Sequence, residues 1–190
     1  MNKDTLWPVH QNTDGYFNTA YGKVVNLNKP EPSTINMADI AAGLSKVCRF
    51  GGQLLDFYSV AQHSLLVAAM APPELKLAAL LHDASEAYLG DVISPLKHIL
   101  GNTYRDVERR FMAVIGEKYG VTTQEFESIK PYDRAALELE HHRFKKLYVG
   151  QWQTKMMYLR LTGLEFFTMG EAEKQFTDAF YAYKKAVTTT

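Results

Sequence analysis

The sequence predicts an all-α fold, a helical bundle that carries a short N-terminal β-hairpin. Apolar residues recur at helical spacing through most of the chain, and helix-capping patterns open several of these stretches. β-Prone residues gather around Tyr21-Gly22-Lys23 near the N-terminus, which predicts the hairpin. A chain of 190 residues with 46% hydrophobic content can bury one core. We therefore expect a single domain over residues 1–190, with a hairpin and linker over 1–34, a helical core over 35–148 and a C-terminal helical extension over 149–190.

The elements follow in order from local signals. The hairpin is expected within residues 16–27, before a proline-containing linker. Asn36 predicts the N-cap of a helix over residues 38–48, and Ser59 with Gln62 forms a capping-box pattern that opens a helix over 59–70. Further helices are predicted over 74–89, 104–119, 131–148 and 170–187, with a turn near 95–100, a short helix over 122–129 and irregular chain over 150–163. Phe176, Phe180 and Tyr183 share one face of the last helix, which predicts a core or oligomer contact.

Composition excludes several classes of protein. The chain has 21 basic and 21 acidic residues and a single cysteine, Cys48. Balanced charge gives no reason to expect a nucleic-acid polymer or a membrane as partner. One cysteine cannot form an internal disulfide and suits a reducing compartment. With no apolar signal core and no stretch long enough to span a bilayer, a cytoplasmic protein is expected.

The most informative feature is the adjacent pair His82-Asp83 within a mostly apolar helical segment. The core stripe of this segment comprises Leu77, Leu80, Leu81, Ala84 and Tyr88. His82, Asp83 and Glu86 lie almost opposite that stripe, at helical spacings that bring the three side chains together. The small residues Ala78 and Ala79 on the same side favour a covered surface. The alternative is a solvated helix face whose acidic residues flank a histidine by chance.

Two further residues are candidate ligands for a metal at this pair. His63 lies in the first turn of the helix that begins near Ser59, and Asp133 lies in the first turn of the helix that begins near Pro131. Each has an ordinary explanation. A lone histidine is more often a packed or surface residue, and an acidic residue in a first turn complements the helix dipole.

The order His63, His82-Asp83, Asp133 resembles the metal site of the HD-domain phosphohydrolases. The finer pattern His82-Asp83-x-x-Glu86-x-x-x-x-Asp91, followed by Ser94-Pro95-Leu96-Lys97, is similar to the small bacterial 5'-deoxynucleotidases and to phage deoxynucleoside triphosphohydrolases, including deoxyadenosine enzymes. Upstream, Cys48-Arg49-Phe50-Gly51-Gly52 and the segment from Phe57 to Ser64 fit the same group. The resemblance spans roughly residues 35–143 and implies an HD-domain helical bundle.

The resemblance also implies roles for these residues. His63, His82, Asp83 and Asp133 would bind the metal, and Glu86 and Asp91 would orient and deprotonate the attacking water. Arg49, Lys97 and Lys130 would hold phosphate oxygens, with Pro95 and Phe50 beside the substrate. Members of the group often carry tryptophan after the arginine, whereas this chain has Phe50. That departure leaves the base and sugar preference open.

The residue types suit one divalent transition metal. Two imidazoles with two carboxylates favour Mn, Co, Zn, Fe or Ni over Mg, which prefers oxygen ligands. Such an ion lowers the pKa of a bound water and polarises a phosphoryl oxygen, the two needs of phosphate ester hydrolysis. Two-metal HD enzymes place extra histidines between the HD pair and the last aspartate, but only His98 lies in that interval here.

Other polar residues are predicted to lie outside the site. Glu138-x-x-His141 matches half of a di-iron carboxylate site, but the chain has no second Glu-x-x-His, so residues 138–146 are expected to form a solvated charged face. His10 and His98 lack a ligand-like partner at helical spacing.

The expected function is hydrolysis of deoxynucleotides, with deoxynucleoside triphosphates such as dATP preferred because Arg49, Lys97 and Lys130 could neutralise much of a triphosphate's charge. Removal of phosphate from deoxynucleoside monophosphates is the close alternative. A non-catalytic metal-dependent nucleotide sensor and a metal-free protein-interaction module also stay open, and the resemblance suggests a homo-oligomer.

Overall fold

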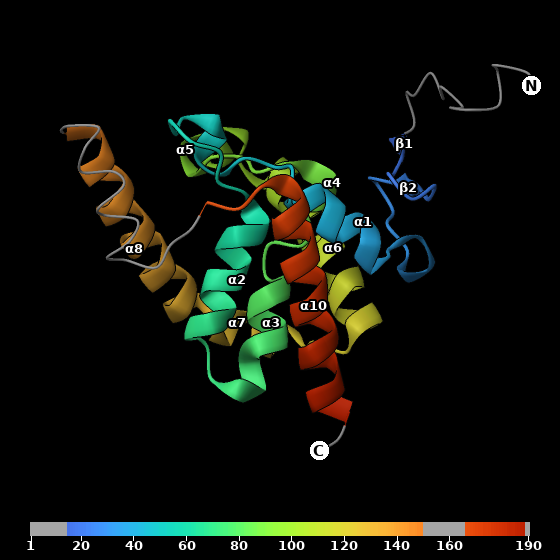
Figure 1. The fold of residues 1–190 in the computed structure, drawn as a ribbon. Helices are drawn as coiled ribbons and strands as arrows, with labels where there is room; N and C mark the ends of the chain where they lie inside the picture. Colours follow the sequence, from blue (N-terminus) through green and yellow to red (C-terminus); the bar gives the residue numbers. More distant parts are fainter. Residues whose placement is uncertain (1–14, 150–165, 189–190) are drawn as a thin grey trace, which may run out of the picture.

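The computed structural model describes residues 15–149 and 166–188. Over these residues the all-α prediction is confirmed, because helices build the fold and the strands form one small hairpin (Figure 1). In chain order the helices are α1 (Met37–Leu44), α2 (Val60–Met70), α3 (Lys76–Leu81), α4 (Glu86–Leu89), α5 (Ser94–Leu100), α6 (Asn102–Tyr119), α7 (Thr123–Ser128), α8 (Lys130–Val149) and α10 (Met169–Thr188). Short 3-10 turns form at η2 (Pro32–Thr34), η3 (Arg49–Gly52) and η4 (Pro73–Leu75). The irregular chain predicted over 150–163 lies outside the described residues, as does His10.

The N-terminal hairpin is present as predicted. Strands β1 (Tyr16–Asn18) and β2 (Val24–Asn26) pair antiparallel, with Phe17 opposite Val25. Beyond the strands, the Thr19 hydroxyl and the Tyr21 backbone N–H both donate to the carboxylate of Asp39, each at 2.8 Å. Asp39 is buried in the first turn of α1, so these bonds fasten the hairpin to the bundle.

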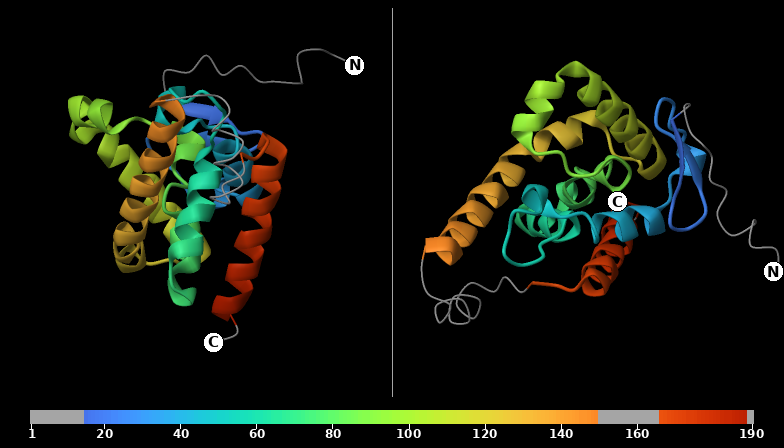
Figure 2. Two further views of the ribbon diagram at one scale, coloured as in Figure 1. Left: turned by 60° about the vertical axis from the view of Figure 1, so that its left-hand side comes forward. Right: turned by 90° about the horizontal axis from the view of Figure 1, so that it is seen from above.

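The core lies where α2, α3 and α10 pack side by side, with α1 across one end (Figures 1 and 2). Its fully buried members include Ile40, Leu80, Phe111 and Phe176. Phe176 and Phe180 of α10 are 0% and 4% exposed, which confirms that this aromatic face belongs to the core. None of the helices among the described residues combines the length and apolar character needed to cross a bilayer.

Local capping patterns in the sequence predicted the starts of two helices correctly. The Asn36 side chain accepts the backbone N–H of Asp39 at 2.7 Å, and Ser59 with Gln62 forms the predicted capping box of α2. The end of α1 was predicted too late, because the helix stops at Leu44 and Cys48 is extended and bridged to Ser59. Arg49 therefore begins the turn η3 and does not lie in the last turn of a helix.

The single helix predicted over 74–89 is divided. α3 ends at Leu81, residues 82–85 form turns, and α4 begins at Glu86. The Ala84 backbone N–H donates to the Leu81 carbonyl oxygen, and the Glu86 backbone N–H donates to the Asp83 carbonyl oxygen. Each of these bonds joins residues three apart, so the chain is wound more tightly than in an α-helix. Side chains three apart eclipse in such a turn, so Asp83 and Glu86 share one side. Gly90, at φ +78°, is the residue that ends α4.

Candidate metal centre

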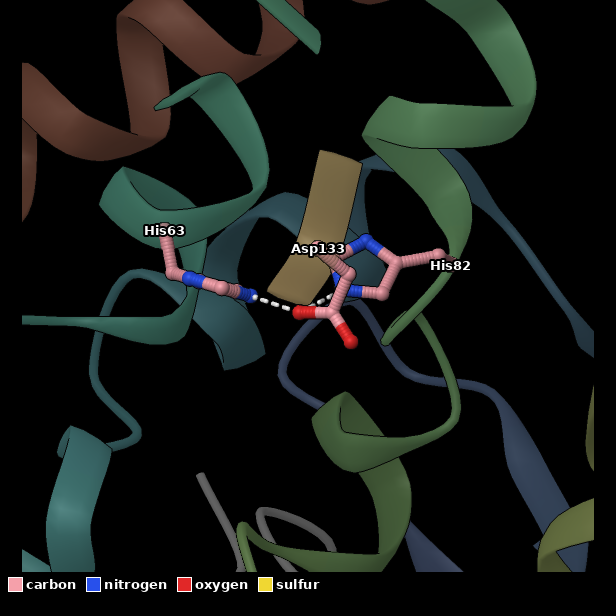
Figure 3. A group of neighbouring side chains, drawn as sticks. All are labelled: His63, His82 and Asp133. Carbon is pink, nitrogen blue, oxygen red and sulfur yellow. Dashed lines mark hydrogen bonds and ion pairs between the residues drawn. The ribbon is translucent and has the colours of Figure 1, made fainter. Parts of the chain in front are cut away.

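Three side chains from distant segments meet at one point inside the bundle. His63 extends from the first turn of α2, His82 follows the last residue of α3, and Asp133 comes from the first turn of α8 (Figure 3). One nitrogen of each histidine and a carboxylate oxygen of Asp133 all lie within 4.8 Å of one another. His63 and Asp133, each unremarkable in the sequence, are thus brought to the HD pair.

His63 is fully buried and bonded at both ring nitrogens. Its Nε2 lies 3.0 Å from Asp133 Oδ1, and its Nδ1 lies 2.7 Å from Glu140 Oε1. A carboxylate oxygen only accepts, so Nδ1 carries a proton toward Glu140. This leaves Nε2 as the atom that faces the centre, the arrangement in which a carboxylate orients a histidine ligand.

The His82 ring is oriented by a hydrogen bond to the backbone. Its Nδ1 lies 2.8 Å from the carbonyl oxygen of Ala79, which can only accept, so Nδ1 is the donor. Its buried Nε2 makes no hydrogen bond with a described residue, although Oδ2 of Asp83 lies 3.0 Å away. A buried ring nitrogen that makes no hydrogen bond with a described residue and lies 3.7 Å from Asp133 Oδ1 fits a metal ligand.

Asp83 lies at the edge of this triad. Its Oδ2 is 3.0 Å from His82 Nε2 and 3.8 Å from both His63 Nε2 and an Arg49 guanidinium nitrogen. Burial alone would raise the pKa of Asp83, but the facing charges of His82, His63 and Arg49 hold it well below its usual range. The carboxylate is therefore ionised and within reach of the centre.

Hydrogen bonding sets the protonation of the other ligands in the metal-free protein. Burial opposes charge on His63, but its bonds to Asp133 and Glu140 outweigh that effect and raise its pKa to about 9. Burial alone would raise the pKa of Asp133. The hydrogen bond from His63 and the charge of His82 outweigh burial and bring this pKa below its usual value. A divalent ion would have to displace the His63 proton, so ion and proton compete for one nitrogen.

Glu86 and Asp91, the predicted water-activating pair, border the centre. Glu86 is 3% exposed, and its Oε2 makes no hydrogen bond with a described residue. Burial, with the negative charges of Asp83 and Asp91, raises the pKa of Glu86 to about 9. Burial also raises the pKa of Asp91, although the positive charge of Arg49 acts to lower it. Two acidic groups with raised pKa values beside a ligand cluster are typical of proton-transfer sites.

The predicted phosphate-binding residues differ in their surroundings. Lys97 Nζ lies 2.7 Å from Glu108 Oε1 and 3.4 Å from Glu86 Oε1, so its charge is engaged by carboxylates. Lys130 is exposed and pairs with Glu127 one turn earlier. Pro95 is exposed in α5, two residues before Lys97. The segment 95–100, expected as a turn, is the helix α5.

Phe50 occupies a backbone conformation that side chains rarely adopt. Its φ is 56°, and Gly51 and Gly52 follow at 61° and 72°, so three successive residues are left-handed. The ring packs against His141 and Phe144, with centroid separations of 5.4 and 5.7 Å, and the Arg49 guanidinium lies 5.3 Å from its centroid. Left-handed conformation costs a non-glycine residue roughly 1–2 kcal/mol. The tight turn sets Arg49 beside Asp83.

Glu140 is the functional residue that the sequence analysis missed. Residues 138–146 were predicted to form a solvated face, yet Glu140 is 0% exposed and Phe144 is 6% exposed. Glu140 accepts hydrogen bonds from His63, from Tyr58 at 2.9 Å and from Arg49 at 3.0 Å. The signal was available, because Ala136, Glu140 and Phe144 fall four residues apart and form one buried stripe. A carboxylate inside an apolar stripe needs partners.

Comparisons with known proteins give relatives without an assigned activity. No protein-family model matches the chain. The chain is 44% identical over 106 residues to the uncharacterized protein YfdR of Escherichia coli (strain K12), and 43% identical over 109 residues to an uncharacterized protein of Rhodobacter capsulatus. The matches cover 56% and 53% of this chain, and 59% and 56% of the relatives. The chain thus spans little more than half the length of the curated relatives it matches.

Proposed function

We propose that the chain is a metal-dependent phosphohydrolase of the HD type that acts on deoxynucleotides, with a deoxynucleoside triphosphate, and dATP first among them, as preferred substrate. The observation that carries the proposal is the convergence of His63, His82 and Asp133 within 4.8 Å, from three segments far apart in the chain. The two imidazoles and two carboxylates of the proposed ligand set suit Mn, Co, Zn, Fe or Ni.

The residues around the triad have different roles in the proposed reaction. A divalent ion bound there supplies a Lewis acid that polarises a phosphoryl oxygen and acidifies a water molecule. Glu86 and Asp91 orient the water and take up its proton. Burial near other carboxylates raises the pKa of both groups in the absence of metal, and the positive charge of a bound ion would lower these pKa values, so that the carboxylates could act as bases. The Arg49 guanidinium, held between Asp83 and Glu140, presents its remaining donors to phosphate oxygens.

Release of phosphate from deoxynucleoside monophosphates is the second candidate. It is favoured by the surroundings of Lys97, whose charge is engaged by Glu86 and Glu108. With Lys97 occupied, Arg49 and Lys130 remain of the three expected phosphate-binding cations, and a monophosphate needs fewer.

Product analysis separates these activities. Purified protein with Mn²⁺ or Co²⁺ is incubated with each dNTP, NTP and dNMP, and nucleoside, orthophosphate and triphosphate are quantified. We expect deoxynucleoside plus triphosphate from dNTPs, and a kcat lowered by about 10²–10⁴-fold in Glu86→Gln. Glu117→Gln, an exposed residue of α6, is the matched control. Turnover of dNMPs alone would select the second candidate. Nucleotide binding without any hydrolysis would rule out both activities and support the non-catalytic nucleotide sensor.

A further inference from the structure

A cavity of about 630 Å³ opens beside the candidate metal centre. His82, Asp83 and Asp133 line one end of it, so whatever binds in the cavity lies next to the triad. Its other walls come from α6, α7 and the start of α8, with Met112, Phe126 and Ile129 among the apolar residues. Ligand pockets commonly enclose about 300–1,000 Å³, so the space suits a substrate fragment.

Three basic side chains line this cavity. Arg105 and Arg109 lie four residues apart on one face of α6, and Lys130 comes from the start of α8. Arg110, the next residue of α6, does not line it. Two of the four basic residues of α6 thus face the cavity.

These cations are available to an anionic ligand. Arg109 pairs with Asp106 and Lys130 with Glu127, but the side chains of both pairs are more than half exposed, and such surface pairs contribute little. Within the described residues no acidic partner lies within ion-pair distance of Arg105. Of the two acidic residues that line the cavity besides Asp83 and Asp133, Glu108 is engaged by Lys97 at 2.7 Å.

The cations of Arg49 and Lys97, which do not line the cavity, are committed to internal partners. Arg49 is 3.0 Å from Glu140 and 3.8 Å from Asp83, and Lys97 lies between Glu86 and Glu108. They can contact one phosphate at the triad but have little charge left to balance a chain of phosphates. Additional phosphate groups would be balanced by the cations of the cavity.

We propose that this cavity binds a linear polyphosphate, the β- and γ-phosphates of a nucleoside triphosphate, with Arg105 and Arg109 as the binding residues. The inference rests on the proposed function and names the residues that hold the outer phosphates of its substrate. In the reaction, a water oxygen bonds to the α-phosphorus and the bond from that phosphorus to the 5'-oxygen breaks. One water proton ends on the 5'-hydroxyl of the released nucleoside, and the other leaves with the inorganic triphosphate or passes to solvent. Inorganic triphosphate is the other product, and it lies in the cavity.

Titration calorimetry with inorganic tripolyphosphate tests this directly, without turnover. Orthophosphate is titrated in parallel, and both are measured with Mn²⁺ present and after chelation. In the double variant Arg105→Ala/Arg109→Ala, we expect tripolyphosphate affinity to fall by about tenfold or more, while orthophosphate affinity changes less than about twofold. Arg110→Ala is the matched control, and it should leave tripolyphosphate affinity unchanged. The KM for dNTPs should rise in the double variant in parallel with the loss of affinity.

Several outcomes would overturn the proposal. Equal losses of tripolyphosphate affinity in the double variant and in Arg110→Ala would mean that only general charge attracts the anion. Unchanged tripolyphosphate affinity together with an altered base preference would assign the cavity to the nucleobase. If no nucleotide is hydrolysed while tripolyphosphate binding still depends on Arg105 and Arg109, the polyphosphate site stands and the proposed hydrolase function fails.

Discussion

Glu140 shows how one side chain can organise a centre without being one of its ligands. Its carboxylate receives three hydrogen bonds, from His63, Arg49 and Tyr58, so it fixes a histidine of the triad and the neighbouring arginine at once. Burial would raise the pKa of Glu140, but His63 and Arg49 more than offset this and hold it below the usual value. An ionised Glu140 therefore keeps Nδ1 of His63 as a donor and leaves Nε2 as the atom that faces the triad.

Glu140→Gln tests this positioning role. The amide can still accept a hydrogen bond but no longer carries the charge that holds His63 and Arg49. We expect the affinity for Mn²⁺ or Co²⁺, measured by titration calorimetry without substrate, to fall by about 10- to 100-fold. Because the change breaks a buried charge network, the free energy of unfolding of the chelated protein should fall by roughly 3 kcal/mol.

Glu138→Gln, two residues earlier on an exposed part of α8, is the matched control and should alter neither quantity. Glu140 would be only a packing residue if its variant lost stability but bound the ion as tightly as the wild-type protein.

At the scale of elements, the tight contact between α1 and α4 places the catalytic candidate Glu86. Gly43 lies where α1 meets α4, and a Cβ added there would come within 2.8 Å of the Ala87 Cβ and 2.9 Å of its carbonyl oxygen. α4 has only four residues and begins at Glu86, so any displacement of Ala87 moves Glu86 as well.

Gly43→Ala should therefore destabilise the protein, although alanine normally favours a helix. We expect the overpacked contact to lower the free energy of unfolding by about 1–3 kcal/mol, as measured by urea denaturation, and to lower kcat through Glu86. Gly170→Ala is the matched control, because Gly170 lies in the first turn of α10 with open space around it. That variant should be neutral or more stable by about 0.5 kcal/mol. Equal stability of the two variants would contradict the account of the α1–α4 contact.

The same scale shows which features of the elements could be predicted from sequence. Helix starts at Asn36 and Ser59 depend on a side chain and a backbone group three residues away, so local pattern was sufficient. The turns at 82–85 and the left-handed run at Phe50-Gly51-Gly52 depend on packing between distant segments. The apolar periodicity wrongly predicted that the helix continues through residues 82–85. Leu80, Leu81 and Ala84 are buried whether or not the helix continues, so their pattern could not show the break.

For the whole molecule, the bundle brings together segments that no local pattern links. The all-α class followed from periodicity, and the triad of His63, His82 and Asp133 followed from a motif spread over 71 positions. The cavity along α6 and α7 did not, because it is created by helices packing at angles that the sequence does not encode locally. The burial of Glu140 was visible in the spacing of Ala136, Glu140 and Phe144, but the partners of its carboxylate come from distant segments. The homo-oligomer and the substrate remain predictions.

Proton binding couples the centre to the stability of the whole chain. His63 has a pKa of about 9 in the folded metal-free protein against 6.5 for the free side chain, so its stabilising contribution is complete below pH 6.5 and is lost as the pH rises to 9. Glu86 has a pKa of about 9 against 4.5, so the folded state holds a proton that the unfolded chain releases. This difference also lowers stability as the pH rises from 4.5 to 9. Both groups act in the same direction between pH 6.5 and 9.

The free energy of unfolding as a function of pH, with chelator and with excess Mn²⁺, tests the central claim most directly. With chelator it should fall between pH 6.5 and 9. With Mn²⁺ the loss should be smaller, and the gap between the curves should widen with pH, because the ion needs the unprotonated Nε2 of His63. His82→Ala should close the gap. Curves that coincide at every pH, with wild type and His82→Ala alike, would show that the triad holds no ion.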